Sequence, residues 1–347
     1  MKNWITTSNI DDKDLVISSR IRLARNLTKI PFPHKLNEEQ SREIIKRVED
    51  AFYSCDVNKE EFTTNYMWQK SELEREIFLE RHIISKNLIE NSSKSAFILD
   101  KNETLSVMIN EEDHVRIQCI TAGLNLEEVY KQSDKVDDML EKNLDYAFDE
   151  KLGYLTACPT NLGTGLRASV MLHLPAISLN NEMNGLLNAV SQVGMTVRGL
   201  YGEGSKALGN IYQISNQVTL GRSEEEIISN LRVLVNQIIN EERVARDKLM
   251  RGSKYELEDR MYRSLGILKS AILLSTNECL KLLSYVRLGV EMGIIKDVNK
   301  GLLNSILVEM QPANIQNKCN KALSSTERDI NRAKFIREKL TSSTTAK

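Results

Sequence analysis

The sequence is poor in the features that accompany nucleic-acid binding and membrane insertion. Its 47 Lys and Arg residues almost balance 48 Asp and Glu residues, and aromatic residues make up only 5% of the chain. Such a chain offers neither a basic surface for phosphates nor stacking platforms for bases. No apolar run reaches the roughly 18 residues that span a bilayer, and the first residues are polar and acidic rather than signal-like. We therefore expect a cytoplasmic protein without nucleic-acid or membrane partners.

Metal-ligating patterns and the common kinase motifs are missing too. Four histidines and five cysteines are scattered along the chain, and no two cysteines form a Cys-x-x-Cys pair. This distribution argues against a disulfide framework and predicts no protein metal ligands. No Gly-Lys-Ser or Gly-Lys-Thr follows a glycine-rich loop, and neither His-Arg-Asp nor Asp-Phe-Gly occurs. A P-loop site and a eukaryotic-type protein kinase are thereby excluded.

Length and periodicity divide the chain into two regions. Its 347 residues exceed the roughly 250–300 residues at which a single core stops growing. Strand-like and helix-like segments are mixed up to about residue 250, whereas apolar residues then recur at helical spacing from Leu257 to Leu268. We predict an α+β domain over residues 1–250 and an all-helical domain over residues 251–347.

Local signals place several elements. Helices are expected over Asn37–Phe52 and from Ser71 and Ser223, because a Gln or Glu follows each capping residue at the third position. Thr326, with Asp329 three residues on, predicts the start of the last helix. Strands are expected at residues 95–100, 105–110, 115–120, 153–158 and 194–198, the first two forming a hairpin.

A run of arginines follows Ser18, where the sequence reads Ser-Ser-Arg-Ile-Arg-Leu-Ala-Arg. In an extended strand Arg20 and Arg22 project from one face and Arg25 from the other. Two neighbouring guanidinium groups can grip a polyphosphate through paired hydrogen bonds. A solvated strand edge is the ordinary alternative, and this run alone does not decide between the two.

Three further segments carry polar side chains at the ends of expected strands. Asn110–Arg116 contains three consecutive carboxylates, which repel one another unless a cation lies nearby. Ala157–Met171 contains Cys-Pro-Thr-Asn-Leu-Gly-Thr before Arg167, and Arg198–Gly204 has three glycines. Each segment has an ordinary structural explanation by itself, such as an acidic surface turn or a mobile loop. Together they collect arginines, carboxylates and a cysteine.

In order and internal spacing these segments resemble the catalytic domain of the phosphagen (ATP:guanido) kinases, and most of all the bacterial protein-arginine kinases. The resemblance covers roughly residues 15–245. It implies an antiparallel β-sheet flanked by helices, followed by an all-helical domain. It also implies transfer of the γ-phosphate of ATP, with Mg²⁺ held by phosphate and water, to arginine side chains of proteins. That modification would mark proteins for regulated degradation in the stress response.

The resemblance assigns roles to individual residues. Glu112 and Glu203 would hold the substrate guanidinium, with Glu112 favoured as the general base, and Cys158 would lie beside it. The nucleotide would be bound by Ser18, Ser19, Arg20, Ile21, Arg22, His82, Arg116, Arg167, Ala168, Ser169, Val170, Met171, Arg198, Gly199, Leu200, Tyr201, Gly202 and Glu203. A second site, for phosphoarginine, would be formed by Arg328, Asp329, Arg332 and Ala333.

The chemistry of guanidinium phosphorylation explains these residue types. A guanidinium has a pKa above about 12 and no free lone pair, so the attacking nitrogen must lose a proton. Two carboxylates can orient the planar group, and one of them can accept that proton. Fixed arginines can neutralise the charge that spreads over the oxygens of the transferred phosphoryl group.

The chain departs from the metabolic phosphagen kinases in two ways. Their small helical N-terminal domain, which encloses a small guanidino substrate, is missing, and a more open site suits an arginine on a protein chain. The helical region after residue 250 is additional. Within it, Arg-Asp-Ile-Asn-Arg-Ala from Arg328 resembles the phosphoarginine pocket of the protein-arginine kinases.

The family resemblance also predicts binding partners, and two alternative functions stay open. The resemblance implies protein substrates with exposed arginines, a homodimer, a zinc-finger activator, a heat-shock repressor among the targets and an AAA+ protease. Two alternatives stay open. One is a kinase for free arginine or another small guanidino metabolite, and the other is a non-catalytic adaptor that binds phosphoarginine.

Overall fold

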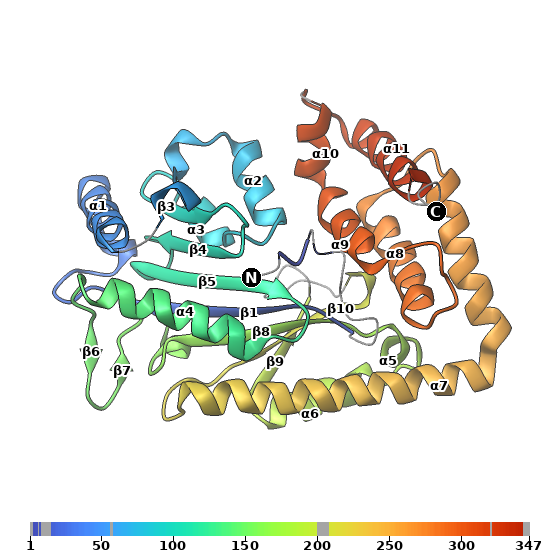
Figure 1. Ribbon diagram of the computed structural model, residues 1–347, viewed down its shortest axis with the longest axis horizontal. Coiled ribbons are helices and arrows are strands. Elements are labelled where there is room, and N and C mark those ends of the chain that lie inside the picture. The colour runs from blue at the N-terminus through green and yellow to red at the C-terminus, as the bar shows by residue number, and fades with distance from the viewer. Residues whose placement is uncertain are drawn as a thin grey trace.

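The computed structural model describes residues 3–5, 7, 15–55, 58–199, 208–319 and 321–342. At its centre lies an eight-stranded sheet in the order β2-β3-β4-β5-β1-β8-β10-β9, with every neighbouring pair antiparallel (Figure 1). This confirms the predicted α+β class and antiparallel sheet. The strands are β1 (Val16–Arg25), β2 (Phe62–Tyr66), β3 (Ala96–Asp100), β4 (Leu105–Ile109), β5 (Val115–Ala122), β8 (Leu166–His173), β9 (Met195–Arg198) and β10 (Ile211–Asn216).

The expected strands are found with one exception. The β3–β4 hairpin, β5 and β9 lie where the sequence predicts them. The strand expected over residues 153–158 is wrong beyond Tyr154, because only β7 (Gly153–Tyr154) pairs, and it pairs with the two-residue strand β6 (Phe148–Asp149). After Cys158 the chain enters a short 3-10 helix over Pro159–Asn161. The proline there has no backbone N–H to give to a ladder.

Eleven helices lie in the described part of the chain: α1 (Glu38–Ser54), α2 (Glu72–Glu80), α3 (Lys86–Glu90), α4 (Leu126–Glu141), α5 (Pro175–Leu179), α6 (Met183–Gln192), α7 (Glu224–Ser270), α8 (Thr276–Glu291), α9 (Lys300–Glu309), α10 (Pro312–Cys319) and α11 (Ser325–Ser342). Complete capping boxes begin α1, α2 and α7 at the three predicted residues. The predicted start of α11 is wrong by two residues. Ser324 and Glu327 form its reciprocal cap, in place of Thr326 and Asp329.

Alternation along the strands gives the sheet two different faces. One face is apolar, with Ile21, Ile117 and Val170 fully buried in a core that also takes in α1, α4 and the first half of α7. The opposite face carries arginines in its middle. Apolar clusters cover this second face on both sides: residues 83–88 pack on β3 and β4, and the C-terminal helices pack on the ends of β1, β5, β8 and β10. The polar middle between these clusters stays open.

Helix α7 joins the sheet to the C-terminal helices without a loop. It runs along the sheet and then turns up into the group formed by α8, α9, α10 and α11 (Figure 1). Its one non-helical residue is Ser253, with φ −147° and ψ 44°, close to the position at which the sequence predicts a domain boundary. In the part of the chain that the structure describes, no helix is both long and apolar enough to cross a membrane.

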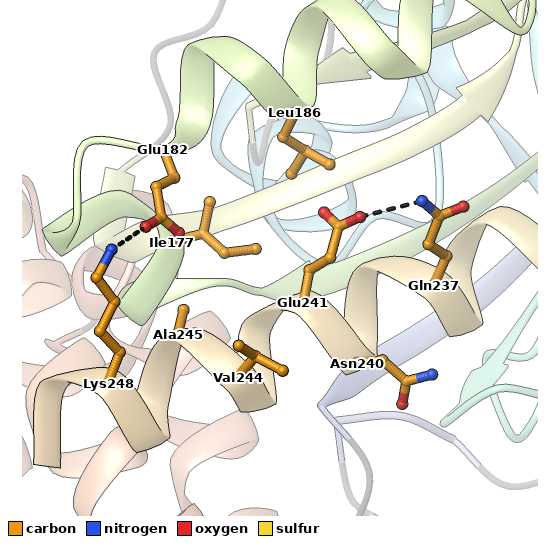
Figure 2. Close-up of a pocket in the computed structure, with 9 residues that line it drawn as sticks. All are labelled: Ile177, Glu182, Leu186, Gln237, Asn240, Glu241, Val244, Ala245 and Lys248. Atoms are coloured by element: carbon orange, nitrogen blue, oxygen red, sulfur yellow. Dashed lines mark hydrogen bonds and ion pairs between the residues drawn. The ribbon is translucent and has the colours of Figure 1, made fainter. Parts of the chain in front are cut away.

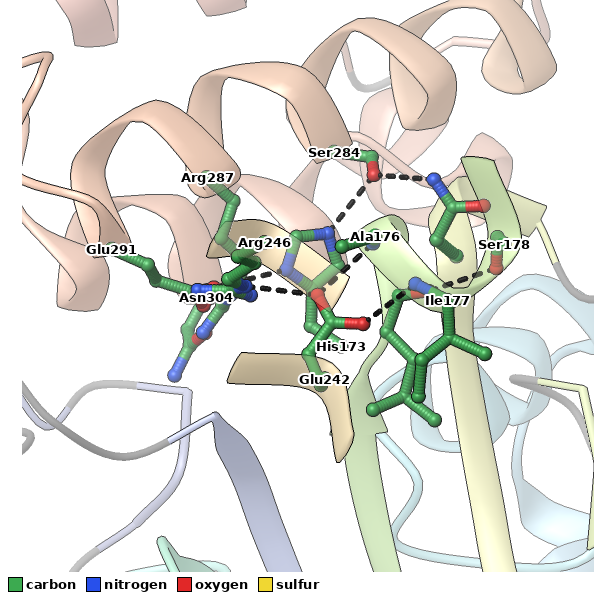
Figure 3. A network of polar contacts seen from close by, with 12 residues as sticks. His173, Ala176, Ile177, Ser178, Glu242, Arg246, Ser284, Arg287, Glu291 and Asn304 are labelled. Carbon is green, nitrogen blue, oxygen red and sulfur yellow. Dashed lines mark hydrogen bonds and ion pairs between the residues drawn. The ribbon is translucent and has the colours of Figure 1, made fainter. Parts of the chain in front are cut away.

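A buried ionic network fastens the helical region to the sheet (Figure 3). Arg246 of α7 bonds Glu242 at 2.8 Å and Glu291 of α8 at 2.6 Å. Glu291 also bonds Arg287 at 3.0 Å and lies 3.3 Å from the Nδ1 atom of His173, at the end of β8. These charges are almost fully buried, so removing one partner would leave another without compensation.

Candidate active site

A cleft of about 490 Å³ opens on the polar face of the sheet. Residues 79–87, from the end of α2 to the start of α3, form one wall, and the turn after Cys158 forms another. In this cleft the structure brings together predicted residues that are far apart in the sequence: Arg20, Arg22, His82, Glu112, Arg116, Cys158, Arg167 and Arg198. The strand register explains part of this convergence, because Arg22 of β1 lies directly opposite Arg167 of β8.

The arginines of the cleft repel one another. Burial, followed by the charges of Arg116 and Arg167, lowers the pKa of Arg20 to about 10. Burial and the same kind of repulsion hold the pKa of Arg22 well below its ordinary value. An anion placed among these side chains would relieve both effects, since an opposite charge favours the charged form.

The hydrogen bonding of Arg20 and Arg22 also indicates that the cleft suits an anion. Arg20 donates from Nη2 to Gln213 at 2.8 Å, which fixes the orientation of its guanidinium. The Nε atom of Arg22 is buried and has no hydrogen-bond partner within the described residues. Buried donors are rarely left unpaired in proteins. The residues present therefore fit a polyphosphate such as that of ATP, whose oxygens would accept these bonds.

The acidic turn Asn110–Arg116 supplies the counter-charges of the cleft. Arg116 lies 2.7 Å from the fully buried carboxylate of Glu111 and 3.1 Å from Glu112. The expectation that the three carboxylates need a nearby cation is met by this arginine. Burial raises the pKa of Glu112, and Arg116 works against that rise. Glu112 is a half-buried carboxylate at the edge of the cleft, with one oxygen held by Arg116.

A second carboxylate joins the acidic turn to the cysteine turn. Asp113 is buried and accepts from the Asn26 side chain at 2.6 Å and from the backbone N–H of Ala157 at 2.7 Å. This bond fixes Cys158 relative to Glu112. The Cys158 thiol is half-buried, and its Sγ lies 3.0 Å from the hydroxyl of Thr160.

His82 forms part of the wall opposite the sheet. Its backbone has a φ of 59°, which is uncommon for a residue other than glycine. The side-chain amide of Gln118 in β5 fixes this turn by donating to the carbonyls of His82 at 2.8 Å and Ile83 at 3.1 Å. Burial, followed by the charge of Arg20, lowers the pKa of His82 to about 3, so its ring is neutral at physiological pH.

Several predicted nucleotide-binding residues do not reach the cleft with their side chains. Ile21, Ala168 and Val170 point into the apolar core on the other face of the sheet. Met171 is covered by the helical region, and the Ser19 hydroxyl is used by the loop at Gly123. Ser18 and Ser169 are buried on the polar face, and Gly199 is buried at the end of β9. Leu200, Tyr201, Gly202 and Glu203 lie outside the described residues.

The predicted phosphoarginine site lies far along the chain on α11. The Arg332 guanidinium is buried and donates to the carbonyls of Met310 and Leu274, each at 2.8 Å, and to Asp329 at 2.5 Å. Arg328 is half-exposed one turn earlier. Ala333 is fully buried in the helical core. Arg332 therefore holds α11 against the segments around it, while Arg328 faces outward.

Sequence reasoning missed the residues that hold the arginines in place. Glu111 was part of the acidic turn but had no assigned role, although it makes the shortest ion pair with Arg116. Gln118 and Gln213 carry no local signal at all. Their positions on β5 and β10, on the same face as the arginines, follow only from the strand register. These two glutamines could be placed beside the arginines only if the order of the strands in the sheet were already known.

A larger hollow, of about 690 Å³, lies between the α5–α6 segment and α7 (Figure 2). Its one lysine, Lys248, is paired with Glu182 at 2.8 Å, and Glu241 accepts from Gln237 at 3.1 Å. Ile177, Leu186 and Val244 supply most of the remaining lining. This hollow has neither the arginines nor the register-aligned polar face of the smaller cleft, and we do not assign it to phosphate.

Solved structures share the fold of the sheet region. The crystal structure of a lombricine kinase matches 70% of this chain and 69% of its own, with a TM-score of 0.59 and 25% identity. A duplicated taurocyamine kinase from Schistosoma mansoni matches 75% of this chain and 39% of its own, with a TM-score of 0.60 and 25% identity. Fold and arginine-lined cleft together define an ATP-dependent phosphotransferase of the phosphagen-kinase type.

Sequence comparisons show which family of phosphagen-kinase-like enzymes the chain belongs to. Residues 43–245 match the ATP:guanido phosphotransferase C-terminal catalytic domain, and residues 254–347 match the protein-arginine kinase McsB C-terminal domain. The protein-arginine kinase of Clostridium kluyveri is 70% identical over 98% of this chain and 99% of its own, and that of Clostridium acetobutylicum 58% identical over 98% and 100%. The chain belongs to the protein-arginine kinase family of ATP:guanido phosphotransferases. The resemblance read from the sequence is thereby confirmed.

Proposed function

We propose that this protein transfers the γ-phosphoryl group of ATP to the guanidinium groups of arginine side chains in other proteins. One observation carries the proposal. A set of mutually repelling arginines shares a cleft with a half-buried carboxylate, Glu112, and a thiol, Cys158. The arginines suit a polyphosphate, and the acidic end of the cleft suits a cation as planar as a guanidinium.

The phosphate end of the cleft is formed by Arg20, Arg22, Arg116, Arg167 and Arg198. They hold the phosphates in place before the reaction and neutralise charge on the transferred group during it. Gln213 and Glu111 fix two of these side chains in advance, so little reorganisation is needed when the anion enters. ATP supplies the phosphoryl group, and Mg²⁺ would be held by phosphate oxygens and water, as magnesium usually is.

The substrate end of the cleft holds the base. Glu112 accepts a proton from the attacking guanidinium nitrogen as the new phosphorus–nitrogen bond forms, while the bond from the γ-phosphorus to the bridging oxygen breaks and ADP leaves with that oxygen. A carboxylate with a raised pKa is a stronger base, and burial raises the pKa of Glu112. Arg116, bonded to the same carboxylate at 3.1 Å, keeps it ionised before the proton arrives. Glu203 would be the second carboxylate on the guanidinium, and Cys158 would add negative charge beside it.

The helical region would connect phosphorylation to later steps that involve other proteins. Residues 251–347 would form a separate domain that binds phosphoarginine at the half-exposed Arg328 and Asp329, and the buried Arg332 and Ala333 would support this site from below. Phosphorylated proteins would then be marked for regulated degradation during stress. Partners would include a zinc-finger activator, a heat-shock repressor as substrate and an AAA+ protease, and the enzyme would act as a homodimer in the cytoplasm.

Release of ADP tests the proposed acceptor. The protein is incubated with ATP and Mg²⁺ and with either free arginine or an unfolded arginine-rich protein, and ADP is measured in both. We expect ADP release that depends on the protein acceptor and is lost in Glu112→Gln. ADP release with free arginine alone would establish the metabolite kinase instead. Binding of a phosphoarginine peptide without any ADP release would establish the adaptor.

A further inference from the structure

Trp4 packs against the wall of the cleft from behind. Its side chain is 1% exposed, and its ring centroid lies 5.6 Å from that of His82, with the two planes tilted by 57°. His82 in turn lines the cleft on its other side. Through this aromatic contact Trp4 touches a residue of the proposed nucleotide site. Aromatic pairs in this geometry are attractive beyond the area they bury.

The position of Trp4 is fixed by the helical region. Its backbone carbonyl accepts from the Asn304 side chain of α9 at 3.0 Å, and Asn304 is held by Arg287 of α8 at 2.7 Å. Trp4 and Ile5 belong to the apolar cluster formed mainly by α8, α9 and α11. Arg287 and Asn304 belong to the buried network (Figure 3), and the bond from Asn304 extends that network to Trp4.

The ring of His82 packs on Trp4, whereas its left-handed backbone turn is held by the side-chain amide of Gln118. Arg20 lines the same cleft, and its charge acts on the His82 ring. A ring that rotated away from Trp4 would change the shape of the cleft wall beside the arginines.

We propose that Trp4 is a positioning residue, which holds the His82 ring in the orientation that binds the nucleotide and so makes the helical region a support of the nucleotide site. This inference rests on the proposed nucleotide role of His82. It assigns Trp4 no contact with the reacting atoms. Loss of the contact is therefore expected to weaken ATP binding and to leave the chemical step intact.

Steady-state kinetics separate an effect on ATP binding from an effect on the chemical step. Trp4→Leu keeps an apolar side chain and removes the ring, and we expect KM for ATP to rise about three- to tenfold with kcat within about twofold, the range that an aromatic pair supports. Trp68→Phe is the matched control, because Trp68 packs on Tyr66 and Arg42 away from the cleft. In a His82→Ala background the Trp4→Leu change should no longer raise KM. Equal loss in kcat and unchanged KM, or additive effects of the two substitutions, would show that Trp4 serves only stability.

Fluorescence gives a second readout that does not depend on the folding of a Trp4 variant. The sequence has two tryptophans, so Trp68→Phe leaves Trp4 as the single emitter. Titration with ATP should shift its emission in a saturable way with the same midpoint as KM. No change in emission in an enzyme that still turns over ATP would overturn the inference. An enzyme that neither binds nor turns over ATP would instead refute the proposed function.

Discussion

Replacing Arg22 by methionine should stabilise the nucleotide-free protein while removing its response to ATP. The Nε atom of Arg22 is buried and has no hydrogen-bond partner in the described structure, and three arginines repel this side chain. A buried donor left unsatisfied costs about 1–3 kcal/mol. Methionine has a similar length and no polar group to desolvate. We therefore expect Arg22→Met to raise the free energy of unfolding by about 1–3 kcal/mol without nucleotide.

Arg25 on the same strand is the matched control. It points to the opposite face, is 1% exposed, bonds Asp137 at 2.5 Å and stacks 3.6 Å above the ring of Tyr154. Removing one partner of a buried ion pair typically costs about 3–5 kcal/mol. Arg25→Met should therefore destabilise the protein by about that amount. The two substitutions are chemically identical, and only the environment of the arginine differs.

Urea unfolding of the wild type and of Arg22→Met, each with and without ATP and Mg²⁺, gives four free energies of unfolding to compare. A ligand at 100 times its Kd stabilises a protein by about 2.7 kcal/mol, and we expect that gain in the wild type and none in Arg22→Met. The reasoning would be refuted if Arg22→Met were destabilising without nucleotide, since that would mean Arg22 is already compensated. It would also be refuted if the variant kept the full gain with ATP.

Three other predictions concern the base, the helical region and acid stability. Glu112→Gln should lower phosphoryl transfer by about 10²–10⁴-fold with unchanged circular dichroism; near wild-type turnover would remove Glu112 from its role. Arg332→Ala should lower the midpoint of urea unfolding, whereas Arg328→Ala should keep it and weaken binding of a phosphoarginine peptide in calorimetric titration. Burial lowers the pKa of His173 to about 4 from 6.5, so the unfolded chain alone binds this proton between those values. Stability is thus full above pH 6.5 and falls with pH below it, and His173→Gln should flatten that slope.

The structural features that the sequence predicted correctly depend on signals within a few neighbouring residues. Capping boxes at Ser71 and Ser223 need only four neighbouring residues, and the alternation that puts Arg20 and Arg25 on opposite faces needs only a strand. The start of α11 was misplaced because Ser324 with Glu327 and Thr326 with Asp329 offer nearly the same pattern. Local reasoning cannot rank two such caps.

The parts that it did not predict depend on contacts between distant segments. Gln213 lies 193 positions from the arginine it orients, and Trp4 lies 78 positions from His82. The resemblance named Ala168 and Val170 as part of a continuous nucleotide-binding run, but a strand turns every second side chain away from the ligand. Only the register of β8 shows which members of such a run face the cleft.

The most direct test of the central claim is mass spectrometry of an arginine-rich acceptor protein after incubation with this protein, ATP and Mg²⁺. Samples must be kept away from acid, because the phosphorus–nitrogen bond is acid-labile. The account predicts phosphate on arginine residues with the wild type and none with Glu112→Gln or Arg22→Met. Phosphate on serine, threonine or tyrosine, or unchanged arginine phosphorylation by Glu112→Gln, would contradict it.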